Sequence, residues 1–232
     1  MEIWLSPALG AGLLLTATAW LHLARRRRQG ARERRHHDAL QLALELLQNL
    51  QKHRGLGPLK DAPSLHQRAA IAQQLEQLWQ RWPSAECRLP ALAAAWPALR
   101  GNPADFNGHC QLIERLLAAI QLLELRLGEH HAQVSAALGE ACRALEDLGR
   151  LRALAVRAAN HPRCPLELQI QMRYLCQRLA GPACEQRVRE VIGRLERELI
   201  GAAKVRLAPT DCFALLTPII DERLQGLRAS LA

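Results

Sequence analysis

The chain has 232 residues, of which 49% are apolar and only 3% aromatic. Its formal charge of +9 includes +5 from residues 1–35 alone, and no basic face interleaved with aromatics follows, so a nucleic-acid partner is excluded. Leucine and alanine dominate and no window alternates apolar and polar residues, so we predict an all-α antiparallel helical bundle, with two four-helix sub-bundles as one possible arrangement.

The first segment predicts a membrane anchor. Residues 3–24 are apolar apart from four polar side chains, which is about the length needed to cross a bilayer core of roughly 30 Å. Seven arginines follow between Arg25 and Arg35. A cleaved secretory signal, the alternative, would carry its charges before the apolar run. Positive charge stays in the cytoplasm, so the N-terminus should lie outside. We predict a single-pass protein of the inner (cytoplasmic) membrane, with a transmembrane anchor (1–24), a basic juxtamembrane segment (25–37) and a cytoplasmic helical body (38–232).

The first helix of the body, from about Asp38 to Leu56, carries an arginine on its apolar face. Its core-facing row consists of Leu40, Ala43, Leu47 and Leu50, which are separated by three, four and three residues. The next residue in this row, four positions after Leu50, is Arg54. A buried guanidinium keeps its proton and needs an anion or a set of acceptors. Alternatively, Arg54 could bend outward and cover the last carbonyls of its helix.

The following segments also read as helices. Ser64 should cap a helix that runs to Trp82, and prolines interrupt the chain at 83, 90 and 97. Asn102 and Pro103 form a cap and first-turn pair for a helix that ends near Leu127. A long helix then reaches about residue 160.

That long helix repeats the arginine pattern. Its apolar residues, Leu138, Ala141, Leu145 and Leu148, take the same steps, and the next step reaches Arg152. Two arginines on two apolar helix faces predict a site for a small anion. Arg152 could instead pair with an acid across the bundle, such as Glu45 or Glu114. If both arginines lie unpaired in the core, replacing either with leucine should relieve a buried charge and leave the fold intact.

The C-terminal third predicts three more helices, over 166–179, 183–206 and from a Thr210 cap to about Ala229. Seven cysteines, an odd number without a Cys-x-x-Cys spacing, argue against a disulfide framework or a zinc site and agree with a cytoplasmic body. Adjacent histidines at 36–37 and 130–131 diverge by about 100° on a helix and cannot chelate one ion, so we expect them to be solvated. No catalytic motif is present, so we predict neither an enzyme nor a cofactor or metal.

The segments around the two arginines resemble a known family. Residues 46–56, Leu-Leu-Gln-Asn-Leu-Gln-Lys-His-Arg-Gly-Leu, and 146–154, Glu-Asp-Leu-Gly-Arg-Leu-Arg-Ala-Leu, are similar to the two arginine signatures of the nitrate- and nitrite-sensing (NIT) domain. Residues 106–113, 211–213 and 217–221 resemble further helix segments of the same family. The resemblance covers roughly residues 40–227. After the first signature the chain departs from the family pattern, because Pro58 should stop the helix early.

The resemblance implies a helical bundle that binds nitrate or nitrite between Arg54 and Arg152, with Gly55 and Gly149 of the two signatures in the site. The function that we expect is therefore a membrane-anchored sensor that relays nitrate or nitrite occupancy to an unknown protein partner or through a homodimer. The alternative is a membrane-anchored helical scaffold or interaction protein that binds no ligand.

Overall fold

The computed structural model describes residues 6–128, 137–181 and 184–231, and side chains within residues 20–127, 138–181 and 184–231. All regular secondary structure in these ranges is helical, which confirms the all-α bundle. The elements are α1 (Ser6–Leu56), α2 (Ala62–Gln80), the short η1 (Ala93–Ala95), α3 (Trp96–Gly101), α4 (Phe106–Gly128), α5 (Ala137–Ala159), α6 (Leu166–Leu179), α7 (Gln186–Leu195), a π-helical turn η2 (Glu196–Ile200) and α8 (Pro209–Ala229).

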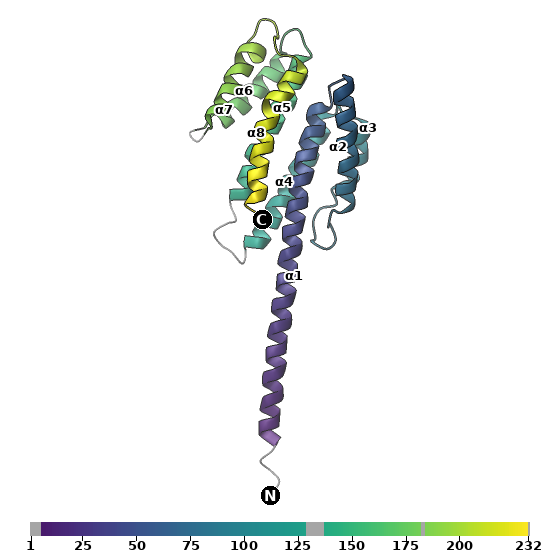
Figure 1. The fold of residues 1–232 in the computed structure, drawn as a ribbon, viewed down its shortest axis with the longest axis vertical. Helices are drawn as coiled ribbons and strands as arrows, with labels where there is room; N and C mark the ends of the chain where they lie inside the picture. The colour runs from purple at the N-terminus through teal and green to yellow at the C-terminus, as the bar shows by residue number, and fades with distance from the viewer. Residues whose placement is uncertain (1–5, 129–136, 182–183, 232) are drawn as a thin grey trace.

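Two helices, α1 and α5, form the centre of the bundle. The C-terminal half of α1 packs against α2, α4, α5 and α8, and α5 packs against α1, α4, α6 and α8. Figure 1 shows α1 and α5 running in one direction while α4 and α8 run in the opposite one. Their buried side chains form a single hydrophobic cluster. The fold is therefore one central four-helix group with α2 and α3 on one flank and α6 and α7 on the other, rather than two sub-bundles.

Several helix starts differ from the predicted ones because aspartates act as the caps. Asp61 accepts a hydrogen bond from the Ser64 backbone N–H at 3.0 Å, so α2 begins at Ala62. Asp105 accepts one from the Gly108 N–H at 2.9 Å, and α4 begins after it rather than after Asn102. Proline at the first position starts α8 before Thr210. The predicted helix over 183–206 is shorter, since η2 ends it at Ile200.

The N-terminal part of α1 projects from the bundle as a stalk (Figure 1). Among the described residues, no helix combines the length and the apolar character that a membrane crossing requires. The predicted anchor, residues 1–24, falls largely outside this description, because residues 1–5 and the side chains up to residue 19 are not part of it. The anchor therefore stays a prediction.

The histidine expectation was wrong in one part. His36 is 9% exposed, since α1 turns this residue toward the bundle, so it is a buried rather than a solvated side chain. His130 and His131 lie outside the described residues. All seven cysteines are free thiols, and burial raises the pKa of Cys142 and of Cys212 to about 12.

Candidate anion-binding site

Arg54 points into the bundle. The apolar residues that precede it on the same face of α1 are fully buried, and its own side chain is 0% exposed. Its Nη1 donates to Glu146 Oε1 at 2.6 Å and its Nη2 donates to Glu146 Oε2 at 3.0 Å, which is a bidentate pair with α5. The outward orientation left open by the sequence is therefore wrong. The carbonyls of Leu56 and Gly57, where α1 ends before Pro58, accept hydrogen bonds from Arg68 of α2 instead.

Glu146 is a residue that sequence reasoning missed as part of this site. Besides Arg54, it accepts a hydrogen bond from Gln51 Nε2 at 3.0 Å, and Arg150 Nε lies 3.6 Å from its Oε1. Its two oxygens accept from Arg54 and Gln51, and among the described residues no hydrogen bond joins Arg152 to them; Glu146 acts on Arg152 only through its negative charge, which raises the Arg152 pKa. The sequence did contain one indication. Glu146 lies in the second arginine segment, six residues before Arg152, and is an acid on the helix that was expected to face Arg54.

Arg152 is the more unusual of the two arginines. It is 0% exposed, and Glu114, one of the acids considered as its partner, pairs with Arg150 at 2.7 Å instead. Its Nη1 donates to Thr217 Oγ1 at 2.9 Å, and the Thr217 hydroxyl itself donates to the Phe213 carbonyl at 2.6 Å. The guanidinium carbon lies 4.6 Å from the centre of the Phe213 ring.

Two donors of Arg152 are buried without a hydrogen-bond partner, Nε and Nη2. These two nitrogens share one edge of the planar guanidinium, which is the fork that matches a pair of oxygens in a planar anion. Each buried donor left unsatisfied costs about 1–3 kcal/mol. A planar anion that presents two oxygens is the kind of group whose acceptors match this edge.

The two arginines differ in how far nearby carboxylates offset the cost of burying their charges. Burial, followed by the nearby positive charge of Arg54, lowers the pKa of Arg152 to about 9. Burial acts the same way on Arg54, but the Glu146 carboxylate more than offsets it and raises the Arg54 pKa. Both guanidinium groups are protonated at neutral pH. The carboxylates of Asp221 and Glu146 raise the pKa of Arg152 but do not offset burial and Arg54, so a further negative charge beside Arg152 would be stabilising.

The two glycines predicted for the site pack against different side chains. A Cβ atom at Gly55 would lie 3.3 Å from Arg152 Nε and 2.9 Å from Phe213 Cε2, so the missing side chain lets α1 approach the Phe213 ring and the Arg152 guanidinium closely. A Cβ atom at Gly149 would lie 2.9 Å from Gln51 Cδ. Gly149 therefore permits the close approach of α5 to α1, and its contact is with Gln51 rather than with either arginine.

A pair of buried histidines lies beside Arg54. His109 Nδ1 is 2.5 Å from the Asp105 carbonyl, which can only accept, so this nitrogen carries the proton. His109 Nε2 must then accept from His53 Nδ1, 2.8 Å away. His53 Nε2 is left as an unprotonated nitrogen. Burial, with the neighbouring His109 and Arg68, lowers the pKa of His53 to about 3.

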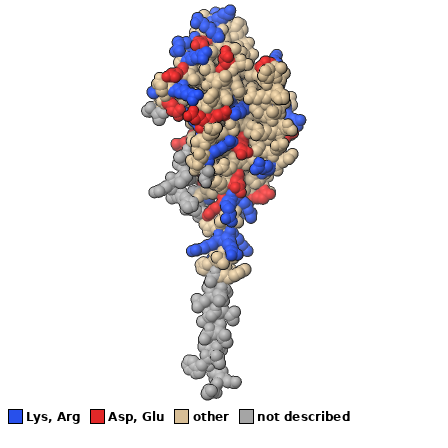
Figure 2. All heavy atoms as spheres, in the orientation of Figure 1, with Lys and Arg blue, Asp and Glu red and all other residues tan. Residues whose placement is uncertain are grey.

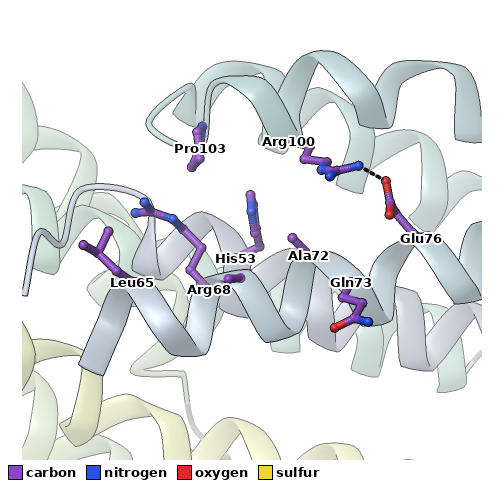
Figure 3. Close-up of a pocket in the computed structure, with 9 residues that line it drawn as sticks. His53, Leu65, Arg68, Ala72, Gln73, Glu76, Arg100 and Pro103 are labelled. Carbon is purple, nitrogen blue, oxygen red and sulfur yellow. Dashed lines mark hydrogen bonds and ion pairs between the residues drawn. The ribbon is translucent and has the colours of Figure 1, made fainter. Parts of the chain in front are cut away.

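His53 also lines a groove of about 540 Å³ between α1, α2 and the turn after α3. Figure 3 shows the His53 ring standing in the middle of this groove, with Arg68 and Pro103 on one side and the Arg100–Glu76 ion pair on the other. The groove is separate from the unfilled edge of Arg152, which lies between α1, α5 and α8. His53 therefore lines the groove, while its partner His109 lies close enough to Arg54 for the guanidinium charge to lower the His109 pKa.

The histidine pair predicts a pH dependence of stability. His53 titrates near 6.5 when unfolded and near 3 when folded, so the unfolded state binds more protons in this interval and stability falls as the pH is lowered from 6.5 toward 3. Replacing His53 with glutamine should flatten this slope, measured as denaturation midpoints between pH 7 and 5. The exposed His161→Gln is the control. An unchanged slope in H53Q would mean that the pair does not set the pH dependence.

Comparisons with known proteins supply no relative. No family model, no curated protein and no solved structure matches this chain. The function must therefore be inferred from the buried arginines and their surroundings.

Proposed function

We propose that the chain is a membrane-anchored sensor that binds nitrate or nitrite at Arg152 in the core of its helical body. The observation that carries this proposal is the unfilled Nε and Nη2 edge of the fully buried Arg152. Nitrate and nitrite are planar, monovalent and able to present two oxygens to one guanidinium edge. The resemblance of the two arginine segments to the NIT signatures supports the same ligand.

In this proposal the two arginines have different tasks. Arg152 binds the anion directly, with Thr217 and Phe213 fixing the plane of its guanidinium. Arg54, held by Glu146, contributes positive charge nearby and ties α1 to α5. The anion would supply acceptors for Nε and Nη2 of Arg152 and offset its positive charge. Binding then favours the conformation in which α1, α5 and α8 lie close together, and a partner protein or a second copy could read that conformation.

Isothermal titration calorimetry on the full-length chain in detergent tests the ligand. Nitrate should bind with a stoichiometry near one per chain, and both Arg152→Leu and Gly55→Ala should lose the heat of binding. The second replacement removes no charge but puts a methyl group beside Arg152 Nε, at 3.3 Å, where an oxygen must sit. Heat that is retained in both variants would place the anion elsewhere. No heat in the wild type would favour the ligand-free scaffold.

We propose that the chain lies in the inner membrane with its body in the cytoplasm. This orientation is inferred from the seven arginines that follow the apolar segment. A reporter that is active only in the cytoplasm, fused after Ala232, should be active. A reporter that is active only in the periplasm should be silent at the same position. The opposite pair of results would reverse the orientation.

A further inference from the structure

The arginines of the stalk are not evenly distributed around α1. Arg25, Arg28, Arg32 and Arg35 step by three, four and three, which places them on one face of the helix. Farther along, the same face enters the core with Ala39 and Leu42, which are 2% and 6% exposed. A topology signal needs only positive charge near the membrane, so it does not explain why one arginine row continues the face that α1 turns toward the bundle.

Two more arginines approach this row from other parts of the fold. Arg126 near the end of α4 and Arg88 in the 83–92 segment line a cavity of about 600 Å³ together with Arg28, Arg32 and Arg35. Arg126 is held in place by a hydrogen bond from its Nη1 to the Cys87 carbonyl. Figure 2 shows the positive side chains gathered where the stalk meets the body.

The cavity has a second lobe on the side of the anchor. This lobe, of about 330 Å³, shares Arg28, Arg32 and Arg126 with the larger one and adds Arg25 and one carboxylate, Glu33, for a formal charge of +3. The larger lobe contains five arginines and one carboxylate, Glu86, for a formal charge of +4. Two adjoining basic lobes with shared arginines suit two phosphate groups joined by a short linker, since each guanidinium can bind phosphate oxygens in pairs.

The depth of the lobes relative to the predicted anchor favours a lipid. With a rise of 1.5 Å per residue, Arg28 lies about 6 Å and Arg32 about 12 Å beyond Ala24 along α1. The headgroup layer on each side of the bilayer core is about 5–8 Å deep, and arginine side chains extend several ångströms toward it. The anchor-side lobe therefore opens at the level of lipid phosphates. Basic pockets at this level are typical sites for polyanionic lipids.

We propose that the junction of α1, α4 and the 83–92 segment binds the headgroup of an anionic phospholipid that carries two phosphates. This site is separate from the nitrate site and rests only on the membrane anchor of the proposed function. Bound lipid would join the stalk to the body through Arg126 and Arg88 and so fix the body against the membrane surface. The orientation of the body would then be set by a ligand rather than by α1 alone.

Lipid binding to the purified full-length chain in detergent, followed by native mass spectrometry, tests the site. Cardiolipin, which has two phosphates, should bind about tenfold or more tighter than phosphatidylglycerol, which has one, because the second phosphate adds charge-assisted hydrogen bonds. The site variant is R28Q/R32Q, which removes two arginines shared by both lobes. The control is R27Q/R34Q, which removes two exposed arginines of the same helix that line neither lobe.

Both variants remove the same charge from the same exposed stretch, so neither should affect folding. R28Q/R32Q should weaken cardiolipin binding by about tenfold or more, and R27Q/R34Q by less than about twofold. Equal losses would show that bulk charge attracts the lipid and would overturn the site. Displacement of cardiolipin by equimolar inorganic pyrophosphate would assign the lobes to a soluble phosphate compound and overturn the lipid. The measurement is made in detergent without nitrate, so its result does not depend on whether the chain binds nitrate.

Discussion

Nitrate should raise the melting temperature of the full-length chain by about 5–10 °C at one hundred times its dissociation constant. A ligand at that concentration stabilises the native state by about 2.7 kcal/mol, and each kcal/mol shifts the melting temperature of a chain of this size by about 2–4 °C. The physical source of the effect is the Nε and Nη2 edge of Arg152, buried without acceptors. Differential scanning fluorimetry in detergent measures it directly.

The ionic controls follow from the shape and charge of the anion. Chloride at equal ionic strength has the charge of nitrate but no pair of oxygens, so it should shift the melting temperature much less. Sulfate is tetrahedral and loses the hydration of two charges when it enters the core, so it should also do less. Arg152→Lys should lose the nitrate effect, because an ammonium group does not present a planar edge. Equal shifts by nitrate in the wild type and in R152L would identify the effect as bulk salt.

Arg54→Leu should destabilise the protein by about 3–5 kcal/mol, because the buried Glu146 carboxylate loses both hydrogen bonds of its bidentate ion pair and keeps only Arg150 at 3.6 Å. The sequence predicted that leucine would be tolerated at either arginine, and the structure corrects this for Arg54, whose Nη1 lies 2.6 Å from Glu146. Arg152→Leu should be neutral or stabilising, since it removes a buried charge and two unsatisfied donors. Urea denaturation at pH 7 gives both free energies of unfolding.

The double variant Arg54→Leu/Glu146→Leu isolates the cause. Replacing a buried ion pair with apolar residues is often neutral or stabilising, so the second replacement should recover most of the stability lost in R54L. R150L is a useful reference, because Arg150 is half-buried and its nearer partner, Glu114, is exposed. If R54L and R152L had equal free energies of unfolding, the Arg54–Glu146 pair would not be holding α1 against α5.

The positions of the two arginines in the core could be predicted from the sequence. Steps of three and four keep residues on one helix face whatever the helix packs against, so the apolar rows predicted both arginines on core-facing positions. They left open whether Arg54 bends outward, which the structure decided. The helical class followed for the same local reason, and Pro58 ended α1 near Leu56 because proline cannot continue a helix.

The partners of the arginines were decided only by the tertiary structure. Periodicity says which face of a helix is buried, but not which helix it meets or at what height. The register of α1 against α5 brings Glu146 to Arg54. It leaves Arg152 with a hydrogen bond from Nη1 to Thr217 and with Nε and Nη2 unpartnered. That register depends on the packing of Gln51 against Gly149 and of Phe213 against Gly55, contacts between residues far apart in the chain. Which arginine is paired and which has an unfilled edge is a property of helix packing, which no local pattern in the sequence encodes.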